Sequence, residues 1–596
     1  MPQEPRAARG WLARLRRRGS ESPEPETEAA TTQPDPAEIL PPDPDASSPP
    51  DAASGDPEAA AEVAGAGDTP ADPGGSPSAE PADAPEPPPE ILLTRTSLEQ
   101  RARDHLAAVV DALAAAGVDC WYVPNPLRPA RTRLGTFAAG PEVLAALAPL
   151  GSMWTFETWD AGTRTWQPAE SQWAPETGGA LRAFTTVWDP GHFRRIGAVA
   201  AVEVDCWWRA DDQLVATLNH VRGTTLPADD PRTPPASVRG QQLWTWRSLT
   251  VTEPTELIEP VDAVITWVDS ADPVYAQARS HLLATPVEPV ETSDAPGAEA
   301  APTPTDSADG GEPQTSTADE LAHAEARTRS LDELRYTLRS LDMFAPWLRR
   351  VWLLTDLQRP EWLDDSTVTV VDHRDVLGDT VELPTFNSHA IETALHRIDG
   401  LAEHFLYFND DTMLGMRAQP GDFFSPTGHP VFQPSGEFLP AGPAGPDEAA
   451  PGVAGRTMRE LLEADFGRTV THKLRHTPHP LTRSLMSEVA DRYPEHWART
   501  AANRFRSPDD IPPISMALWY ALLTGRASTA SPTYTYVELS EVTESAELEE
   551  LAGRLRRSAF FCLNLRSDPV LPWDELAAMT GSLLDSLFPF TSRFER

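Results

Sequence analysis

Between residues 261 and 411 the sequence alternates short apolar segments with helical patterns, and three apolar segments end in acidic residues. Each is rich in β-branched or aromatic side chains, as expected for strands buried on both faces of a parallel sheet. The segments and their acids are Val261–Val268 with Asp269, Val351–Leu354 with Asp356, and Phe405–Phe408 with Asp410 and Asp411. This alternation of strands and helices predicts βαβ units and an α/β fold with a Rossmann-like, mostly parallel sheet.

The first predicted helix covers residues 330–342 and separates two of these strands. Ser330 and, three residues later, Glu333 match a capping box. Leucines recur on one face of this helix, whereas Arg335 and Arg339 are four residues apart and share another face.

A second predicted helix precedes the strand at Phe405. Asn387 or Ser388 can cap its start, and Gly400 is a typical C-terminal stop. Glu392 and His396 are four residues apart on this helix, so they are expected to share a face.

The acids that end the strands indicate where a ligand would bind. Ligands of open α/β sheets bind beyond the carboxyl ends of the strands, so these acids can converge on one crevice. The adjacent Asp410 and Asp411 need compensation for their charge, which Mg²⁺ or Mn²⁺ bridging to diphosphate oxygens would supply. The run Asn409-Asp410-Asp411 is equally compatible with an ordinary turn.

Arginine and histidine residues near these acids are candidates for phosphate binding and proton transfer. Arginine can grip phosphate with two hydrogen bonds, although each arginine alone also fits a surface ion pair. The arginines are Arg335, Arg339, Arg397 and Arg506. A histidine cluster at His472, His476 and His479 offers a neutral imidazole as a base. Metal ligation by these histidines and plain solvated loop histidines are the alternatives.

Composition divides the chain into parts. Residues 1–90 are rich in Pro, Ala and acidic residues and predict disorder, because they have too few large apolar side chains to form a core. Residues 91–255 are expected to form an accessory α/β region, and residues 256–596 to form the domain that contains the acid-ended strands. That domain contains a second disordered segment at about residues 285–320 and a loop at residues 439–455.

Charge and cysteine content narrow the function and the compartment. The formal charge of −41 argues against non-specific nucleic-acid binding, which requires Lys and Arg to replace phosphate counterions. Three widely spaced cysteines indicate a reducing compartment and predict neither a disulfide framework nor a thiolate zinc site. No apolar run is long enough to span a membrane, and no apolar segment follows the basic residues 6–18 as in a secretory signal. We therefore expect a cytoplasmic protein, with peripheral contact at the inner membrane face as an option.

Four blocks of sequence, in order, resemble the Stealth family. This family includes bacterial capsular-polysaccharide phosphotransferases and the animal N-acetylglucosamine-1-phosphotransferase. The blocks are Asp262–Pro273, Asp332–Leu363, Leu383–Gly415, and a fourth that runs from His472 or His476 through FRSPDD and Trp519-Tyr520 to a late match at Phe560–Asn564. Together they cover roughly residues 260–565 apart from the insertions. The late match reads FFCLN.

The resemblance implies a reaction and roles for particular residues. An acceptor hydroxyl of a glycan would attack the β-phosphorus of a nucleotide-sugar, taking the sugar-1-phosphate and releasing a nucleoside monophosphate. The third block implies Asn409, Asp410 and Asp411 at the metal–diphosphate site, and Glu392 with Arg397 as active-site residues. The first block implies Asp262 and Asp269 near the nucleotide. The fourth block implies His476 as the base, with His479 as second choice, and Arg506 as the residue that binds the phosphate. Asn387, Arg335 and Arg339 complete the expected substrate-binding set.

Two departures from the family pattern affect the turns after strands. Leu357 follows Asp356 where the family usually has glycine, and Ser270-Ala271-Asp272 stands where Gly-Ser-Asp is more usual.

A conventional nucleotide-sugar glycosyltransferase and an inactive glycan-binding scaffold are the alternative functions. The region 91–250 matches no family pattern by itself.

Overall fold

The computed structural model describes residues 91–92, 97–284 and 330–596, apart from short gaps. The gaps are residues 126–129, 171–172, 174, 176, 190–191, 193, 379–380, 443, 446–447, 449 and 566. The predicted disorder of residues 1–90 and the whole predicted insertion at about 285–320 lie outside the described residues. None of the described helices is long and apolar enough to cross a bilayer.

A five-stranded sheet in the order β17-β16-β15-β18-β23 forms the centre of the second half of the chain. Its strands are β15 (Val261–Thr266), β16 (Val351–Thr355), β17 (Val368–Asp372), β18 (His404–Asn409) and β23 (His479–Thr482). The first four pair in parallel, and β23 pairs antiparallel with β18. The predicted mixed α/β fold and the parallel pairing of the three acid-ended strands are therefore confirmed.

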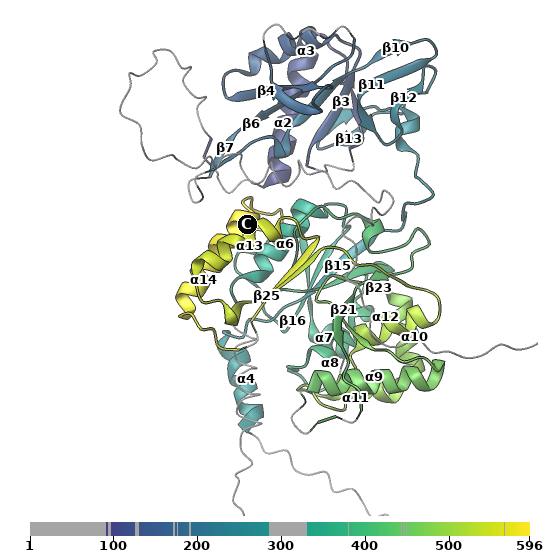
Figure 1. Cartoon of the computed structure of the whole chain (residues 1–596), viewed down its shortest axis with the longest axis vertical. Helices are drawn as coiled ribbons and strands as arrows, with labels where there is room; N and C mark the ends of the chain where they lie inside the picture. The colour runs from purple at the N-terminus through teal and green to yellow at the C-terminus, as the bar shows by residue number, and fades with distance from the viewer. Residues whose placement is uncertain are drawn as a thin grey trace, which may run out of the picture. The chain divides into compact units, whose positions relative to one another are not determined.

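Both faces of this sheet are buried, as the apolar composition of the strands predicted. Phe405 and Tyr407 point into a core that they share with α8–α12, whereas Leu406 and Phe408 point into a core that they share with α6. The helices of the first face are α8 (Ser388–Glu392), α9 (Ala450–Phe466), α10 (Arg483–Arg492), α11 (Pro494–Ala502) and α12 (Pro513–Leu523). Figure 1 shows α9–α12 grouped together on one side of the sheet.

Helix α6 (Glu333–Phe344) begins later than the predicted capping box. Asp332, not Ser330, is the N-cap, and it has a left-handed backbone with φ 67°. The Glu333 carboxylate turns back to accept hydrogen bonds from Ser330 Oγ at 3.0 Å and Leu331 N at 2.7 Å. The pairing of Ser330 and Glu333 exists, but it closes a turn in front of the helix.

Two other sequence-based boundaries were wrong. The helix predicted to run from Asn387 to Gly400 breaks after Glu392, and a separate 3₁₀ turn, η5, covers Leu395–Arg397. Asn387 does cap α8, because its side chain accepts from His389 N. The loop predicted at residues 439–455 ends earlier, because α9 begins at Ala450 and buries Ala454 and Gly455.

A second sheet has three strands in the order β19-β26-β25, and its strand β19 follows β18 directly in the chain. Its strands are β19 (Thr412–Leu414), β25 (Tyr534–Glu538) and β26 (Phe560–Asn564), and the helices α13 (Ser545–Leu555) and α14 (Trp573–Leu587) accompany it. Thr412 pairs with Cys562, so residues 150 positions apart come together directly after Asp411.

The remaining elements of the second half are short. They are α4 (Pro273–Ala284), α7 (His373–Leu377), β20 (Val431–Phe432), β21 (Pro434–Phe438), β22 (His472–Leu474) and β24 (Ser528–Thr529), with 3₁₀ turns at Pro420–Asp422 and Leu539–Glu541. β21 pairs antiparallel with β22, which leads into the histidine cluster.

The region from residue 91 to 250 has its own six-stranded sheet, in the order β2-β3-β9-β6-β4-β5. The strands are β2 (Trp121–Val123), β3 (Thr132–Thr136), β4 (Trp154–Asp160), β5 (Thr165–Pro168), β6 (Ala180–Thr185) and β9 (Val202–Cys206). Helices α2 (Leu98–Ala115) and α3 (Gly140–Leu147) pack on it through Leu106, Val109 and Val143. Smaller elements are β1 (Ile91–Leu92), β7 (Val187–Asp189), β8 (Arg194–Ile196), β10 (Trp208–Ala210), β11 (Gln213–His220), β12 (Gly223–Pro227), β13 (Ala236–Val238) and β14 (Gln241–Leu243), with 3₁₀ turns at Ala148–Leu150, Ala198–Ala200 and Arg247–Thr250.

A buried ion pair ties α6 to the C-terminus of the chain. Arg339 donates to both oxygens of Glu595, at 2.9 Å each, and to the carbonyl of Phe588. Burial alone would raise the pKa of Glu595, but the hydrogen bonds and charge of Arg339 outweigh it and hold that pKa below its ordinary value. Removing one member of such a pair leaves the other charge buried without compensation.

We expect Arg339→Ala to destabilise the protein by about 3–5 kcal/mol, because it strands the Glu595 carboxylate. A lowered unfolding midpoint in thermal or urea denaturation would show it. Arg335→Ala is the matched control, since Arg335 is more exposed and its closest partner, at 2.8 Å, is the exposed Asp332; it should cost less than about 1 kcal/mol. Equal midpoints for the two variants would contradict the prediction.

Candidate active site

Three carboxyl groups gather at the carboxyl end of β18. Asp410 and Asp411 follow the strand, and Glu333 comes from the start of α6. Burial raises the pKa of Asp410 well above its ordinary value, and the charges of Glu333 and Asp411 raise it further. Burial likewise raises the pKa of Glu333 to about 7. Carboxylates that disfavour each other's ionisation in this way form a site where a cation would be stabilised.

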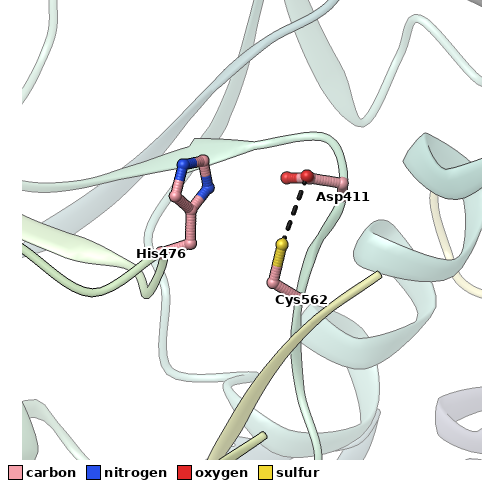
Figure 2. Close-up of side chains that lie close together, drawn as sticks. All are labelled: Asp411, His476 and Cys562. Atoms are coloured by element: carbon pink, nitrogen blue, oxygen red, sulfur yellow. Dashed lines mark hydrogen bonds between the residues drawn. The ribbon is translucent and has the colours of Figure 1, made fainter. Parts of the chain in front are cut away.

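Asp411 also contacts a cysteine from the adjoining sheet, as Figure 2 shows. Cys562 Sγ donates to Asp411 Oδ2 at 3.2 Å, and the Thr412–Cys562 strand pair sets this contact. The ring of His476 faces the same space, and ligand atoms of Asp411, His476 and Cys562 all lie within 4.8 Å of one another. Burial, followed by the charge of Asp411, raises the pKa of the Cys562 thiol.

His476 lies in a turn whose neighbours are anchored. Arg475 N donates to Gln433 O at 3.0 Å, and Thr477 Oγ1 donates to Gln433 Oε1 at 2.9 Å. The His476 side chain is exposed, whereas His479 is part of β23 and stacks on Tyr407 with 6.4 Å between ring centroids. Burial and the nearby His476 lower the pKa of His479 to about 3, so His479 is neutral.

A second polar cluster holds the start of α8 against the loop at residues 503–510. Asp510 is fully buried and accepts from Asn387 Nδ2 at 2.9 Å, Asn503 Nδ2 at 2.7 Å and Ser507 N at 3.0 Å. Burial alone would raise the pKa of Asp510, but these hydrogen bonds and the nearby ring of His389, with Nδ1 3.5 Å from Asp510 Oδ2, lower it. The cluster therefore keeps a negative charge under α8.

Arg506 and Glu392 lie near this cluster. Arg506 is exposed and donates to Ser388 Oγ at 2.8 Å, so its guanidinium stands over the first turn of α8. Burial raises the pKa of Glu392, and the proximity of His389 and Arg506 partly offsets this.

Tyr407 connects the two clusters. Burial raises the pKa of its phenol well above 10, and the charges of Glu392 and Asp410 raise it further, so both carboxyl groups are near it. The hydroxyl of Tyr407 lies 3.0 Å from Thr266 Oγ1 on the neighbouring strand. The carboxyl end of β18 thus has acids on one side of Tyr407 and a guanidinium with a further carboxyl on the other.

Comparison with known proteins shows to which family the chain belongs. Two family models match: Stealth protein CR2, conserved region 2, over residues 327–432, and Stealth protein CR3, conserved region 3, over residues 475–523. A relative, exopolysaccharide phosphotransferase CpsY of Mycobacterium leprae, is 34% identical over 68% of this chain and 70% of its own length. The chain belongs to the Stealth family.

Other relatives carry the same description. Two exopolysaccharide phosphotransferases of Streptomyces coelicolor are 36% and 35% identical, over 56% and 70% of this chain. The matches cover only 57% and 42% of the lengths of these two relatives. The matched Stealth regions contain Glu333, Asp410, Asp411, His476 and Arg506.

Asp262 does not lie where the resemblance implied. It stands at the amino end of β15, opposite to the end that carries Asp410, and it is fully buried. Arg349 binds both its oxygens, at 2.8 and 2.6 Å, and Trp352 Nε1 and Ala402 N also donate to it. The prediction that Asp262 contacts the nucleotide is corrected, because Asp262 lies at the opposite end of the strand and both its oxygens are bound by groups of the protein.

The two arginines of α6 are likewise occupied. Arg339 is buried against Glu595, and Arg335 contacts Asp332 and Glu595 and covers the ring of Trp362. The prediction that they share a helix face is confirmed by their common partner. The prediction that they bind phosphate is corrected, since in this structure they hold the C-terminal segment.

Arg397 is also displaced from the site. It is exposed in η5, next to His396, whose carbonyl accepts from Arg483. Arg483 N in turn bonds the carbonyl of Glu403, directly before β18. Arg397 therefore lies at the amino end of β18, because the chain passes from the carboxyl edge to the amino edge of the sheet between Glu392 and this turn.

The acids after β15, β16 and β17 form a separate group. Burial raises the pKa of Asp356, and the charges of Asp372 and Asp272 raise it further. Asp269 bonds Gln358 through its backbone and Ala271 N through its side chain. The convergence of Asp269 and Asp356 with Asp410 and Asp411 on one crevice stays a prediction.

Sequence reasoning overlooked four groups of the site. Glu333 was interpreted as a capping residue, and Tyr407 as a core aromatic. Asp510 was part of the quoted run FRSPDD, and Cys562 part of FFCLN, without a role for either. A signal existed for Glu333, since it starts the helix of a βαβ unit and the start of such a helix lies at the carboxyl edge of the sheet.

We expect Asp510→Ala to loosen the loop at residues 503–510 and the start of α8. The Ser507 amide loses its acceptor, and the Phe386 N–H bond to Arg504 O (2.7 Å) loses its support. Hydrogen exchange followed by mass spectrometry should show faster exchange in both segments. Asp509→Ala is the control, because Asp509 is exposed; equal exchange in the two variants would contradict the role given to Asp510.

Proposed function

We propose that this chain transfers a hexose-1-phosphate, such as N-acetylglucosamine-1-phosphate, from a nucleotide-sugar to a hydroxyl of a glycan in exopolysaccharide synthesis. The hydroxyl oxygen forms a bond to the β-phosphorus, the phosphoanhydride bond breaks, and a nucleoside monophosphate leaves. The product is a phosphodiester between sugar and glycan. The relatives' description as exopolysaccharide phosphotransferases supports this reaction class.

The observation that carries the proposal is the joint position of acids, an imidazole and a guanidinium at the carboxyl end of β18. Glu333, Asp410 and Asp411 form the acidic side, where His476 is exposed to solvent. Arg506 and Glu392 lie beyond Tyr407. Phosphoryl transfer needs positioning and neutralisation of phosphate charge more than covalent catalysis, and this set of groups provides both.

Each residue has a specific task in this mechanism. His476 accepts the proton of the attacking hydroxyl at an imidazole nitrogen, since its side chain is exposed and free to meet an acceptor. His479 is half-buried in β23 and is the weaker candidate for base. Arg506 binds the diphosphate oxygens with its guanidinium. Asn387 acts indirectly, because its side chain is bound to Asp510 and supports the α8 turn that Arg506 covers.

A divalent cation, Mg²⁺ or Mn²⁺, fits the acidic side of the site. Asp410 and Asp411 are its proposed ligands, with Asn409 beside them and Glu333 in electrostatic contact. The donor set is suited to a hard cation, because carboxylate oxygens are the usual protein ligands of Mg²⁺ and these carboxylates repel one another. When bound, the cation would neutralise negative charge on the diphosphate oxygens.

Product analysis tests the reaction. Purified protein with Mg²⁺, a panel of nucleotide-sugars and short glycans should release a nucleoside monophosphate and form a phosphodiester visible by ³¹P NMR and mass spectrometry. Release of a nucleoside diphosphate without a phosphodiester would overturn the proposal in favour of conventional glycosyl transfer. Absence of any product with an otherwise folded protein across the panel would also count against it.

His476→Ala should lower the rate by about 10²–10⁴-fold with little change in unfolding midpoint, because it removes the base from an exposed position. Asp410→Asn should abolish turnover through loss of the cation site. His472→Ala is the matched control for the first variant: His472 bonds Ser435 O at 3.0 Å and has no task in the mechanism. A wild-type rate for His476→Ala would remove it from the site.

A further inference from the structure

We propose that Asp411, His476 and Cys562 form a binding site for a thiophilic divalent cation such as Zn²⁺, and that a cation held there inhibits transfer. The inhibitory part rests on the proposed function, whereas the binding part does not. Sequence spacing predicted no thiolate zinc site, because the three cysteines are far apart and none belongs to a CxxC pair. The fold supplies the missing ligands from two other segments.

The geometry of the three side chains favours one small ion. One ligand atom of each residue lies within 4.8 Å of the other two. Zinc–ligand bonds of 2.0–2.3 Å in a tetrahedron hold ligand atoms about 3.4–3.6 Å apart, so a small rotation of the exposed His476 ring is enough. Asp411 Oδ2 and Cys562 Sγ already lie 3.2 Å apart. Figure 2 shows the imidazole and carboxylate on either side of the sulfur.

Strand pairing makes this site rigid on two sides. Cys562 is buried in β26, which is paired with β19 on one edge and β25 on the other. Leu563 N donates to the Asp411 carbonyl at 3.1 Å, which fixes the backbone of the carboxylate ligand. His476 is the exposed member on the solvent side, so an ion can enter from there.

The ligand types distinguish this site from the proposed magnesium site. Thiolate and imidazole are ligands of Zn²⁺ and similar transition metals, whereas Mg²⁺ prefers oxygen. Three protein ligands leave one tetrahedral position open for water or a substrate oxygen. On binding, the Cys562 proton that now lies between sulfur and Asp411 goes to solvent, and sulfur becomes a thiolate ligand.

Inhibition follows because the two sites share residues. A cation bound to the imidazole nitrogen occupies the lone pair with which His476 would accept the acceptor's proton. It also withdraws Asp411 from the magnesium site. Thiophilic cations should therefore compete with transfer at concentrations where Mg²⁺ supports it, and a chelator should reverse the effect.

Metal binding to the full chain tests the site directly. Zn²⁺ titration by calorimetry should give one tight site per chain, and Co²⁺ should give a sulfur-to-cobalt absorption band in the near ultraviolet. Cys562→Ser should abolish the band and weaken Zn²⁺ binding by at least the roughly 10- to 100-fold that loss of an outer-shell partner costs. His476→Ala, at an exposed position, should weaken binding similarly.

Cys120→Ser is the matched control, since Cys120 is a free, partly buried thiol of the 91–250 region. It should keep both the band and the zinc affinity. Equal zinc affinity for wild type, Cys562→Ser and His476→Ala, or no tight site in the wild type, would overturn the proposal.

Activity is measured separately as the ratio of rates with and without Zn²⁺ for each protein. Wild type and Cys120→Ser should lose most of their rate on zinc addition and regain it with EDTA, whereas Cys562→Ser should keep most of its own zinc-free rate. Zinc that binds at the triad without slowing transfer would overturn the inhibitory part. If no transfer occurs even with Mg²⁺, the proposed function fails, and the titrations still decide whether the cation site exists.

Discussion

The pairing of β18 with β15 in the middle of the parallel sheet is the constraint on which the candidate site depends. Six residue pairs, from Val261–His404 to Thr266–Asn409, place the end of β18 at the same edge as its neighbours. Tyr407 is thereby held beside Thr266, and Asp410 emerges at the sheet edge. Since α6 covers one face of the sheet and α8 the other, Glu333 and Glu392 approach this edge from opposite sides.

Unbalanced charge at this edge is what makes it a site and not only a strand end. Two other buried acids of the second half of the chain have cationic partners: Asp262 has Arg349, and Glu595 has Arg339. Asp410 instead lies among like charges, and burial followed by the charges of Glu333 and Asp411 raises the pKa of its carboxyl. Acids in such an environment are stabilised when a cation or a cation-bound phosphate arrives, which is a physical basis for substrate binding.

Sequence patterns predicted the strands and the acid run at Asp410 because these features are local: hydrophobic period and side-chain type are visible in a window of a few residues. They failed where long-range contacts compete with local preference. Ser330 and Glu333 match a helix cap, yet the pair closes a turn before α6. Arg339 resembles a phosphate-binding arginine on a helix face, but a segment 250 residues later provides its partner. The resemblance placed Arg397 in the active site, but the chain breaks after Glu392 and forms a separate turn at Leu395–Arg397.

The sequence by itself determined the α/β class, the acids at the ends of the strands and the resemblance to the Stealth family, because periodicity and ordered motifs are properties of the chain. Only the tertiary structure decided which polar groups meet. It brought Cys562 to Asp411 through one strand pair, placed His476 opposite them, and directed Asp262, Arg335 and Arg339 to internal ion pairs. The physical reason is that a contact between residues far apart in sequence depends on the path of the folded chain, and no local pattern encodes that path.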